Sequence, residues 1–174
     1  MAIIKISKNV SAAKPVTEPA VIAPLTPPVR RMPEWWKKQS GLIATHCSQL
    51  ANLPPGSLTH RDNVMIAALL GYGPREAHET LWKSGTITTD WIKIAPWFLH
   101  PEIGESMLPE DALWEIHRTA VEGGYGGWAT LALPSSGKGP WKAEAKSSWA
   151  AWAIVLLQAF DDDAFIPKHD GAKS

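Results

Sequence analysis

The sequence predicts a mostly α domain, a compact bundle of five or six short helices around a buried C-terminal helix, preceded by an extended proline-rich N-terminal arm. Three observations predict this class. Residues 149–160 are apolar apart from Gln158. Apolar residues recur at helical spacing in several stretches between residues 33 and 123. Five prolines stand between residues 15 and 28, where they interrupt any regular element.

Length and composition set the organisation of the chain. Its 174 residues suit one domain with an extension, and we divide it into an arm (1–32), a helical globular domain (33–166) and a polar tail (167–174). Cys47 is the single cysteine, which excludes an internal disulfide and favours a reducing compartment. Lys and Arg number 17, as do Asp and Glu, so net charge gives no argument for nucleic acid or an anionic membrane. We expect a location in the cytoplasm or within a viral particle.

The central element of the prediction is one helix over Trp141–Phe160. Its second half, from Trp149, is apolar on every side of a helix, which indicates burial on all sides. Those twelve residues would span about 18 Å, short of the roughly 30 Å hydrocarbon layer, so no membrane segment is expected. Three consecutive aspartates, 161–163, should end the helix.

Two earlier helices carry end signals. Pro33 suits the first position of a helix that could run to about Leu50, and Leu-Pro-Pro-Gly at 53–56 would end it. Thr59 and Asp62 form a capping box before the apolar block 64–70.

Two more helices follow from spacing and from terminating glycines. One covers 75–83 and closes at Gly85. The other opens at Pro109 and ends at Gly123. Its inward stripe would consist of five apolar residues, Ala112, Leu113, Ile116, Ala120 and Val121. Residues 90–95 and 128–133 suit either a helix or a strand, and 134–140 is expected to be a loop.

The arm supplies the expected partner contacts. Residues 2–6 could form a short strand that adds to the sheet edge of a partner. The remaining arm is extended, and too apolar for a purely solvated linker. The predicted partner-binding residues are apolar arm residues and the first two tryptophans of the domain: Ile3, Ile4, Ile6, Val21, Ile22, Leu25, Trp35 and Trp36.

No motif assigns a catalytic residue, a cofactor or a metal. Residues 135–139, SSGKG, resemble a phosphate loop, but Ala132 and Gly139 occupy two positions where that loop needs Gly and Ser or Thr. The six histidines lack metal-ligand spacing. A site built across helices from His78, Glu115 and His117 would need tertiary contacts, because neighbours one or two apart on a helix do not face one another.

Two rival functions stay open. A small glycosidase-like hydrolase would use Glu115 or Glu122 near the segment GGYGGW (123–128), and it requires two carboxyl groups about 5–10 Å apart across a cleft. A nucleic-acid binder would use the basic first 40 residues, with Trp35 and Trp36 as stacking surfaces beside Lys37 and Lys38.

The sequence as a whole favours a non-enzymatic structural or interaction protein. It would bind a protein partner, or a second copy of itself, through the arm and exposed tryptophans. Small accessory and assembly proteins of phages and other mobile elements have this character, which is an analogy of composition.

Overall fold

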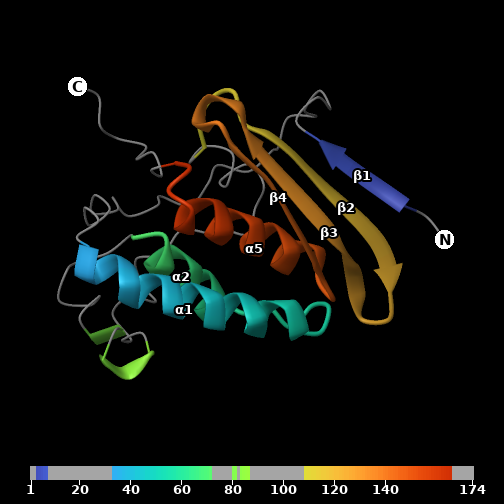
Figure 1. The fold of residues 1–174 in the computed structure, drawn as a ribbon. Coiled ribbons are helices and arrows are strands. Elements are labelled where there is room, and N and C mark those ends of the chain that lie inside the picture. Colours follow the sequence, from blue (N-terminus) through green and yellow to red (C-terminus); the bar gives the residue numbers. More distant parts are fainter. Residues whose placement is uncertain (1–2, 8–32, 72–79, 82, 87–107, 166–174) are drawn as a thin grey trace, which may run out of the picture.

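The computed structural model describes residues 3–7, 33–71, 80–81, 83–86 and 108–165. Within them lie a four-stranded antiparallel sheet and three α-helices (Figure 1). The strands are β1 (Ile3–Ser7), β2 (Leu113–Val121), β3 (Gly124–Leu133) and β4 (Lys138–Ala145), in that order across the sheet. The helices are α1 (Pro33–Asn52), α2 (His60–Leu69) and α5 (Ser148–Asp161). The predicted all-helical bundle is therefore wrong, and the domain is mixed α and β.

The helix α5 lies at the centre of the domain. It packs on β3 and β4 on one side and on α1 on the other, and α2 contacts both helices. Trp152, Val155, Leu156 and Leu157 are fully buried, while only Trp149 and Gln158 between residues 148 and 160 are half-buried. The expectation that residues 149–160 form a helix buried on all sides is confirmed.

The first half of the predicted C-terminal helix is instead strand β4. Trp141, Ala143 and Ala145 are buried, and Lys142 and Glu144 between them are exposed. This alternation has the period of two that a half-buried strand requires. Ser147 occupies the N-cap position of α5 with extended backbone and without a side-chain capping bond. The chain reverses direction there, and α5 returns across the sheet. The predicted loop 134–140 is shorter than expected, because β4 begins at Lys138.

The predicted helix 109–123 is strand β2. Trp114 and Ile116 are buried against α5, whereas three residues of the predicted inward stripe, Leu113, Ala120 and Val121, are exposed. Residues 128–133, which suited either structure, belong to β3. β2 and β3 form a hairpin whose last pair is Val121 with Gly124.

The helix predicted to start at Pro33 and to run to about Leu50 is confirmed as α1. Its buried face consists of Gln39, Ile43, His46 and Leu50, at helical spacing. The amide of Gln39 donates to the carbonyl oxygens of Ala68 and Leu69 at the end of α2, where carbonyl groups lack partners within the helix.

The predicted capping box of α2 is present as well. The Thr59 side chain accepts from the Asp62 backbone N–H, and the Asp62 carboxylate accepts from the Thr59 N–H at 2.7 Å. Residues 80–81 and 83–84 are helical, and Gly85 follows in a left-handed conformation. The other residues of the predicted helix 75–83, and all of 90–95, lie outside the described part.

Replacing Gly41 with alanine is expected to stabilise the domain by about 0.5–1 kcal/mol. Gly41 is exposed inside α1, and a Cβ added there meets no atom within 4 Å, so alanine improves helix propensity without a steric cost. The measurement is the free energy of unfolding in urea. Ala44→Gly, at an exposed position of the same helix, is the matched control and should lower stability by a similar amount. A loss of stability in Gly41→Ala would contradict the placement of this residue.

Candidate functional site

The outer face of the sheet, opposite α5, carries an aromatic and charged row. Alternation along the strands directs Glu115 and His117 of β2, Trp128 of β3 and Lys142 of β4 to this face. The His117 and Trp128 rings stack, with centroids 3.6 Å apart and planes 14° apart. The Lys142 Nζ lies 4.6 Å from the Trp128 ring centroid. A Glu115 carboxylate oxygen lies 3.3 Å from His117 Nε2.

The Trp128 indole thus has two contacts within the sheet surface, one with an imidazole ring and one with an ammonium group. Because β3 lies between β2 and β4, His117 and Lys142 approach the ring from opposite sides. A stacking platform for a nucleobase or a sugar needs a free ring face. The half-buried Trp128 therefore takes part in the packing of the sheet surface.

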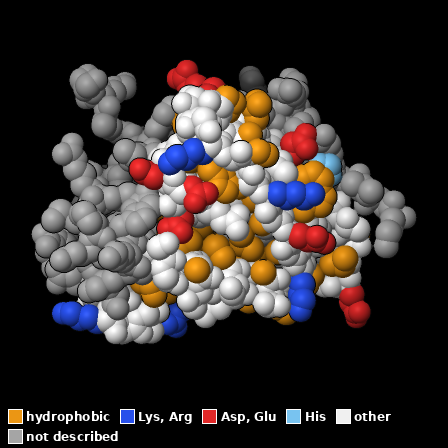
Figure 2. All heavy atoms as spheres, viewed as in Figure 1, with side chains coloured by type: hydrophobic (Ala, Val, Ile, Leu, Met, Phe, Trp, Pro, Cys, Tyr) orange, Lys and Arg blue, Asp and Glu red, His pale blue; other side chains and the backbone are white. Residues whose placement is uncertain are grey.

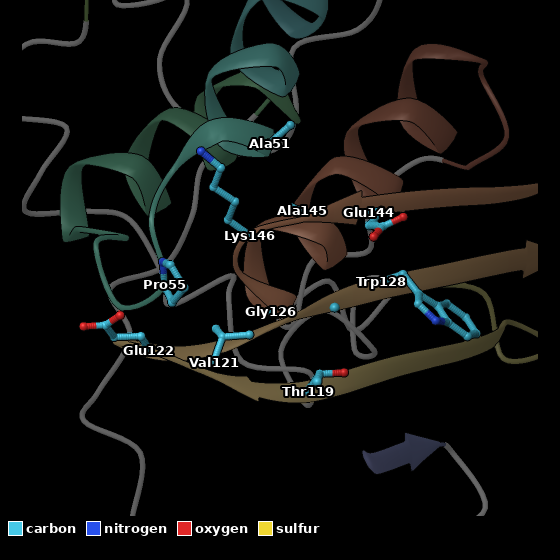
Figure 3. A pocket seen from close by; sticks show the side chains of 11 residues that line it. Ala51, Pro55, Thr119, Val121, Glu122, Gly126, Trp128, Glu144, Ala145 and Lys146 are labelled. Carbon is cyan, nitrogen blue, oxygen red and sulfur yellow. The ribbon is translucent and has the colours of Figure 1, made fainter. Parts of the chain in front are cut away.

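A groove opens where the β2–β3 hairpin extends past the end of β4 (Figure 3). Its volume is about 720 Å³. We call it the hairpin-end groove, and its lining comes from the end of α1, the loop after it and the three neighbouring strands: Ala51, Pro55, Thr119, Val121, Glu122, Gly126, Gly127, Trp128, Glu144, Ala145 and Lys146. The register explains the opening, since β4 pairs with β3 only as far as Gly127, opposite Ala145.

Close packing of glycine against proline holds the hairpin in place beside this groove. A Cβ on Gly124 would lie 3.1 Å from the Pro55 Cβ, and one on Gly56 would lie 3.0 Å from the Gly123 carbonyl oxygen. Glycine at these positions lets the hairpin turn contact the loop after α1 directly. The segment GGYGGW thus forms the hairpin turn and the start of β3.

Three charged side chains line the hairpin-end groove. Glu122 and Lys146 are exposed, as is Glu144. Within the described part of the chain, none of the three makes a hydrogen bond or an ion pair. Figure 3 shows the Glu122 and Glu144 carboxylates at opposite ends of the groove, pointing away from one another.

The carboxylates on which the hydrolase hypothesis rested are not brought together. Glu115 lies in β2 and Glu122 in the turn seven residues later, a separation of about 23 Å along an extended strand. Asp111 accepts from the Ser135 N–H at 2.6 Å and from its hydroxyl at 3.0 Å, so it holds the loop after β3. The hydrolase hypothesis needs a second carboxyl group across a cleft, and two further carboxylates of this part of the sequence, Glu102 and Glu105, lie outside the described residues.

The residues that resembled a phosphate loop have a structural role. The Lys138 ammonium donates to the carbonyl oxygen of Asp162 at 2.5 Å and to that of Asp163 at 3.3 Å. It therefore lies at the C-terminus of α5, where a cation is favourable. The Trp141 indole N–H donates to the Asp162 carboxylate at 2.6 Å, and the Ser40 hydroxyl donates to Asp161 at 2.8 Å. The three aspartates thus fix the end of α5 to β4 and to α1.

The neighbours His46 and Cys47 are unsuited to nucleophilic chemistry. Burial lowers the pKa of His46, partly offset by its hydrogen bond with Gln49. Burial, with a smaller contribution from Asp161, raises the pKa of Cys47 to about 11. At neutral pH the thiol is protonated and the imidazole is uncharged, whereas a reactive cysteine requires the thiolate.

The described residues contain neither a metal-ligand cluster nor a membrane-spanning helix. No group of three or more His, Cys, Asp or Glu side chains in the described ranges is placed to hold a metal ion. Nor does any helix among them have the length and apolarity to cross a bilayer. Glu115 and His117 are in contact. The sequence-based prediction excluded this contact because it assumed a helix, whereas residues two positions apart on a strand lie on the same face. His78 lies outside the described part.

The predicted partner-binding residues fall into three groups. Ile3, Ile4 and Ile6 belong to β1, opposite Thr119, Arg118 and Ile116 of β2 in the register.

Val21, Ile22 and Leu25 lie outside the described residues. So do the side chains of Trp35 and Trp36, whose backbone forms the first turn of α1. Of the tryptophan side chains that the structure describes, Trp114, Trp141 and Trp152 are buried and the other two are half-buried. The described tryptophans thus build the core and its margins.

The hairpin-end groove was missed by the sequence argument. The signal that could have found it is the alternation Trp-Lys-Ala-Glu-Ala at 141–145, which places Lys142 and Glu144 on one face of a strand.

Comparison of the chain with protein-family models, with curated proteins and with solved structures finds no match. The described residues of the chain offer exposed apolar side chains and charges of both signs.

Proposed function

We propose that this is a non-enzymatic interaction protein that holds a protein partner by strand addition, using its N-terminal arm and the edge of β2. One observation carries the proposal. The strand β1, Ile3–Ser7, pairs with β2 and forms the outer strand of the sheet, although residues 8–32 separate it from α1. The sequence predicted a strand that adds to the sheet edge of a partner. In this structure the strand pairs with β2 of its own chain, which supports β2 as an edge that can accept such a strand.

The edge of β2 needs a strand. Without β1, the backbone of residues 115–119 would present unpaired N–H and C=O groups at the margin of the sheet. An edge of this kind is a template for any extended segment of suitable side-chain pattern. The five antiparallel pairs from Ile3 with Thr119 to Ser7 with Glu115 define the length of such a segment.

The connection of β1 to the domain permits exchange. Residues 8–32 separate it from α1, and 25 residues can span up to about 80 Å when extended. Two strands joined by a tight turn remain neighbours. A strand on so long a connection behaves like a ligand tethered to its binding site, because it can leave the sheet edge and bind again. Among the described elements β1 packs chiefly against β2, so few contacts oppose its replacement.

The test uses a fluorescent peptide of residues 1–10 and the full chain carrying Ile4→Pro and Lys5→Pro. Of two neighbouring strand residues, one directs its N–H to the adjacent strand, so this pair of prolines removes β1 from the sheet. We expect saturable binding of the peptide, followed by fluorescence anisotropy, and at least about tenfold weaker binding to the wild-type chain, whose own β1 competes.

A peptide with the same two prolines is the matched control and should not bind. The proposal fails if the variant, folded by circular dichroism, binds neither peptide or binds both equally.

A further inference from the structure

The strand β4 forms one edge of the sheet, and one of its sides has no partner strand among the described elements (Figure 1). On its other side β4 pairs with β3 from Lys138 to Ala145. Beyond that ladder, the backbone of residues 139–145 makes no hydrogen bond within the described part of the chain. The outward N–H and C=O groups of β4 are therefore available to a further strand.

The stretch of this edge that can accept a strand is short and held in place. It begins after Pro140, which has no N–H to donate, and β4 ends at Ala145. The Trp141 indole N–H donates to the Asp162 carboxylate at 2.6 Å, which fixes the stretch to the end of α5. An edge that is already ordered loses little conformational entropy on association. We call residues 141–145 the β4 edge.

The side chains of the β4 edge, Trp-Lys-Ala-Glu-Ala, complement themselves in antiparallel pairing. About a two-fold axis at Ala143, Lys142 of each copy lies opposite Glu144 of the other. Both charged side chains are exposed and lie on one face of the strand, and opposite charges directly across two strands stabilise the pair. On the inner face the same register sets the large Trp141 opposite the small Ala145.

The other edge of the described sheet lacks this property. The strand β1, Ile-Ile-Lys-Ile-Ser, carries one charge, and Lys5 stands at its centre. Antiparallel pairing of two β1 strands about that residue would place like charges opposite one another, which is destabilising. The charge pattern thus favours β4 as the edge that joins two copies.

Neither the helices nor the overall charge opposes such a contact. A two-fold axis through a continuous antiparallel sheet is perpendicular to the sheet, so the helices of both copies lie on the same side. Besides α5, the helix α1 contacts β4, and the exposed residues of α1 between 41 and 48 are all small: Gly41, Ala44, Thr45 and Ser48. Figure 2 shows charges of both signs interspersed on the face that carries the helices and the sheet, and the net charge is zero, so repulsion between copies is weak.

We infer that the β4 edge pairs with the β4 edge of a second copy, which joins two sheets of four strands into one. In this two-fold contact the same edge serves on both copies. The inference goes beyond the proposed function, since neither β1 nor β2 takes part in the contact.

The test is sedimentation velocity of the full chain over a range of concentrations, with charge reversals. The wild type is expected to dimerise. Lys142→Glu and Glu144→Lys each place like charges opposite one another twice, and each should lower the association constant about tenfold or more. The double variant restores both pairs and should recover most of the association. Both positions are exposed, so these variants should keep the fold.

Hydrogen–deuterium exchange locates the contact. Outward amides of the β4 edge should exchange more slowly in the dimer than at concentrations where the wild type is monomeric, because they gain hydrogen-bond acceptors. Lys83→Glu and Glu122→Lys change exposed charges outside the β4 edge and should dimerise as the wild type does. The chain with Ile4→Pro and Lys5→Pro should also dimerise unchanged.

Four results would overturn the inference. One is a wild type that remains monomeric at millimolar concentration. Another is a double variant that associates as weakly as the single variants. The third is a dimer without slower exchange at residues 141–145. The fourth is a dimer that disappears in the proline variant, since that dimer would arise from exchange of β1.

Discussion

Leu157→Asp is expected to unfold the domain. Leu157 is fully buried in α5, between the sheet and α1, and a carboxylate there would lack both water and a partner. The cost is about 5 kcal/mol or more, comparable with the entire stability of a typical domain. The measurement is far-ultraviolet circular dichroism together with thermal unfolding, in which the variant should show no cooperative transition. Ile154→Asp, at a 4 % exposed position of the same helix, should behave alike.

The matched control is the residue beside it. Gln158 is half-buried and polar, so Gln158→Glu should retain the cooperative transition. If Leu157→Asp stayed folded and merely lost self-association, α5 would be an interface helix, and its place in the core would be wrong.

Gly127→Ala is expected to destabilise the domain by about 3 kcal/mol or more. Gly127 has a φ of +151°, and a Cβ added there would lie only 1.8 Å from the carbonyl oxygen of His117 on the neighbouring strand. That atom belongs to backbone in the middle of β2, so relief of the clash requires breaking the β2–β3 ladder. The free energy of unfolding in urea measures the loss.

Gly137→Ala separates the two causes of the lost stability, which are the positive φ and the steric clash with His117. Gly137 also has a positive φ, +65°, but a Cβ there meets nothing within 4 Å. Its replacement should cost only the left-handed backbone term, about 1–2 kcal/mol. Equal losses of stability in the two variants would show that the clash with the His117 carbonyl oxygen contributes nothing to the destabilisation by Gly127→Ala.

The sequence predicted those elements whose end signals are local. Pro33 at the start of α1, the capping box at Thr59 and Asp62, and the apolar run before Asp161 each act within a few residues, and the structure contains all three. The strand predicted within residues 2–6 is present as β1. Its acceptor could not be predicted, because pairing with β2 joins residues more than 100 positions apart.

The errors have physical causes in particular residues. In β2 the inward position 118 is an arginine, whose guanidinium lies 4.0 Å from the Trp149 ring centroid. This cation interrupts the apolar alternation that would have indicated a strand. The apolar residues of this segment also recur by chance at helical spacing, and this spacing led to the prediction of a helix. In β4 the inward positions 143 and 145 are alanines, which are strong helix formers. Their small size suits the packing of α5 against β4, and that tertiary requirement is invisible to local propensity.

The candidate site was harder to predict than the core. Glu115 and Glu122 attracted attention as carboxylates near aromatic residues, but their separation depends on whether the segment is a helix or a strand. Glu144 and Lys146 lay in what the sequence presented as a helix. The groove exists only because β4 ends before the hairpin does, and strand lengths of this kind follow from pairing between distant segments.

The central position of α5 also governs the order in which the domain can form during translation. The sheet and α1 meet mainly through this helix, which follows every other described element in the chain. Until residue 161 has left the ribosome, β2–β4 and the earlier helices lack the surface that buries them. Domain formation must therefore wait for the last described helix, and the apolar faces of Trp114, Ile116 and Leu131 remain uncovered until then.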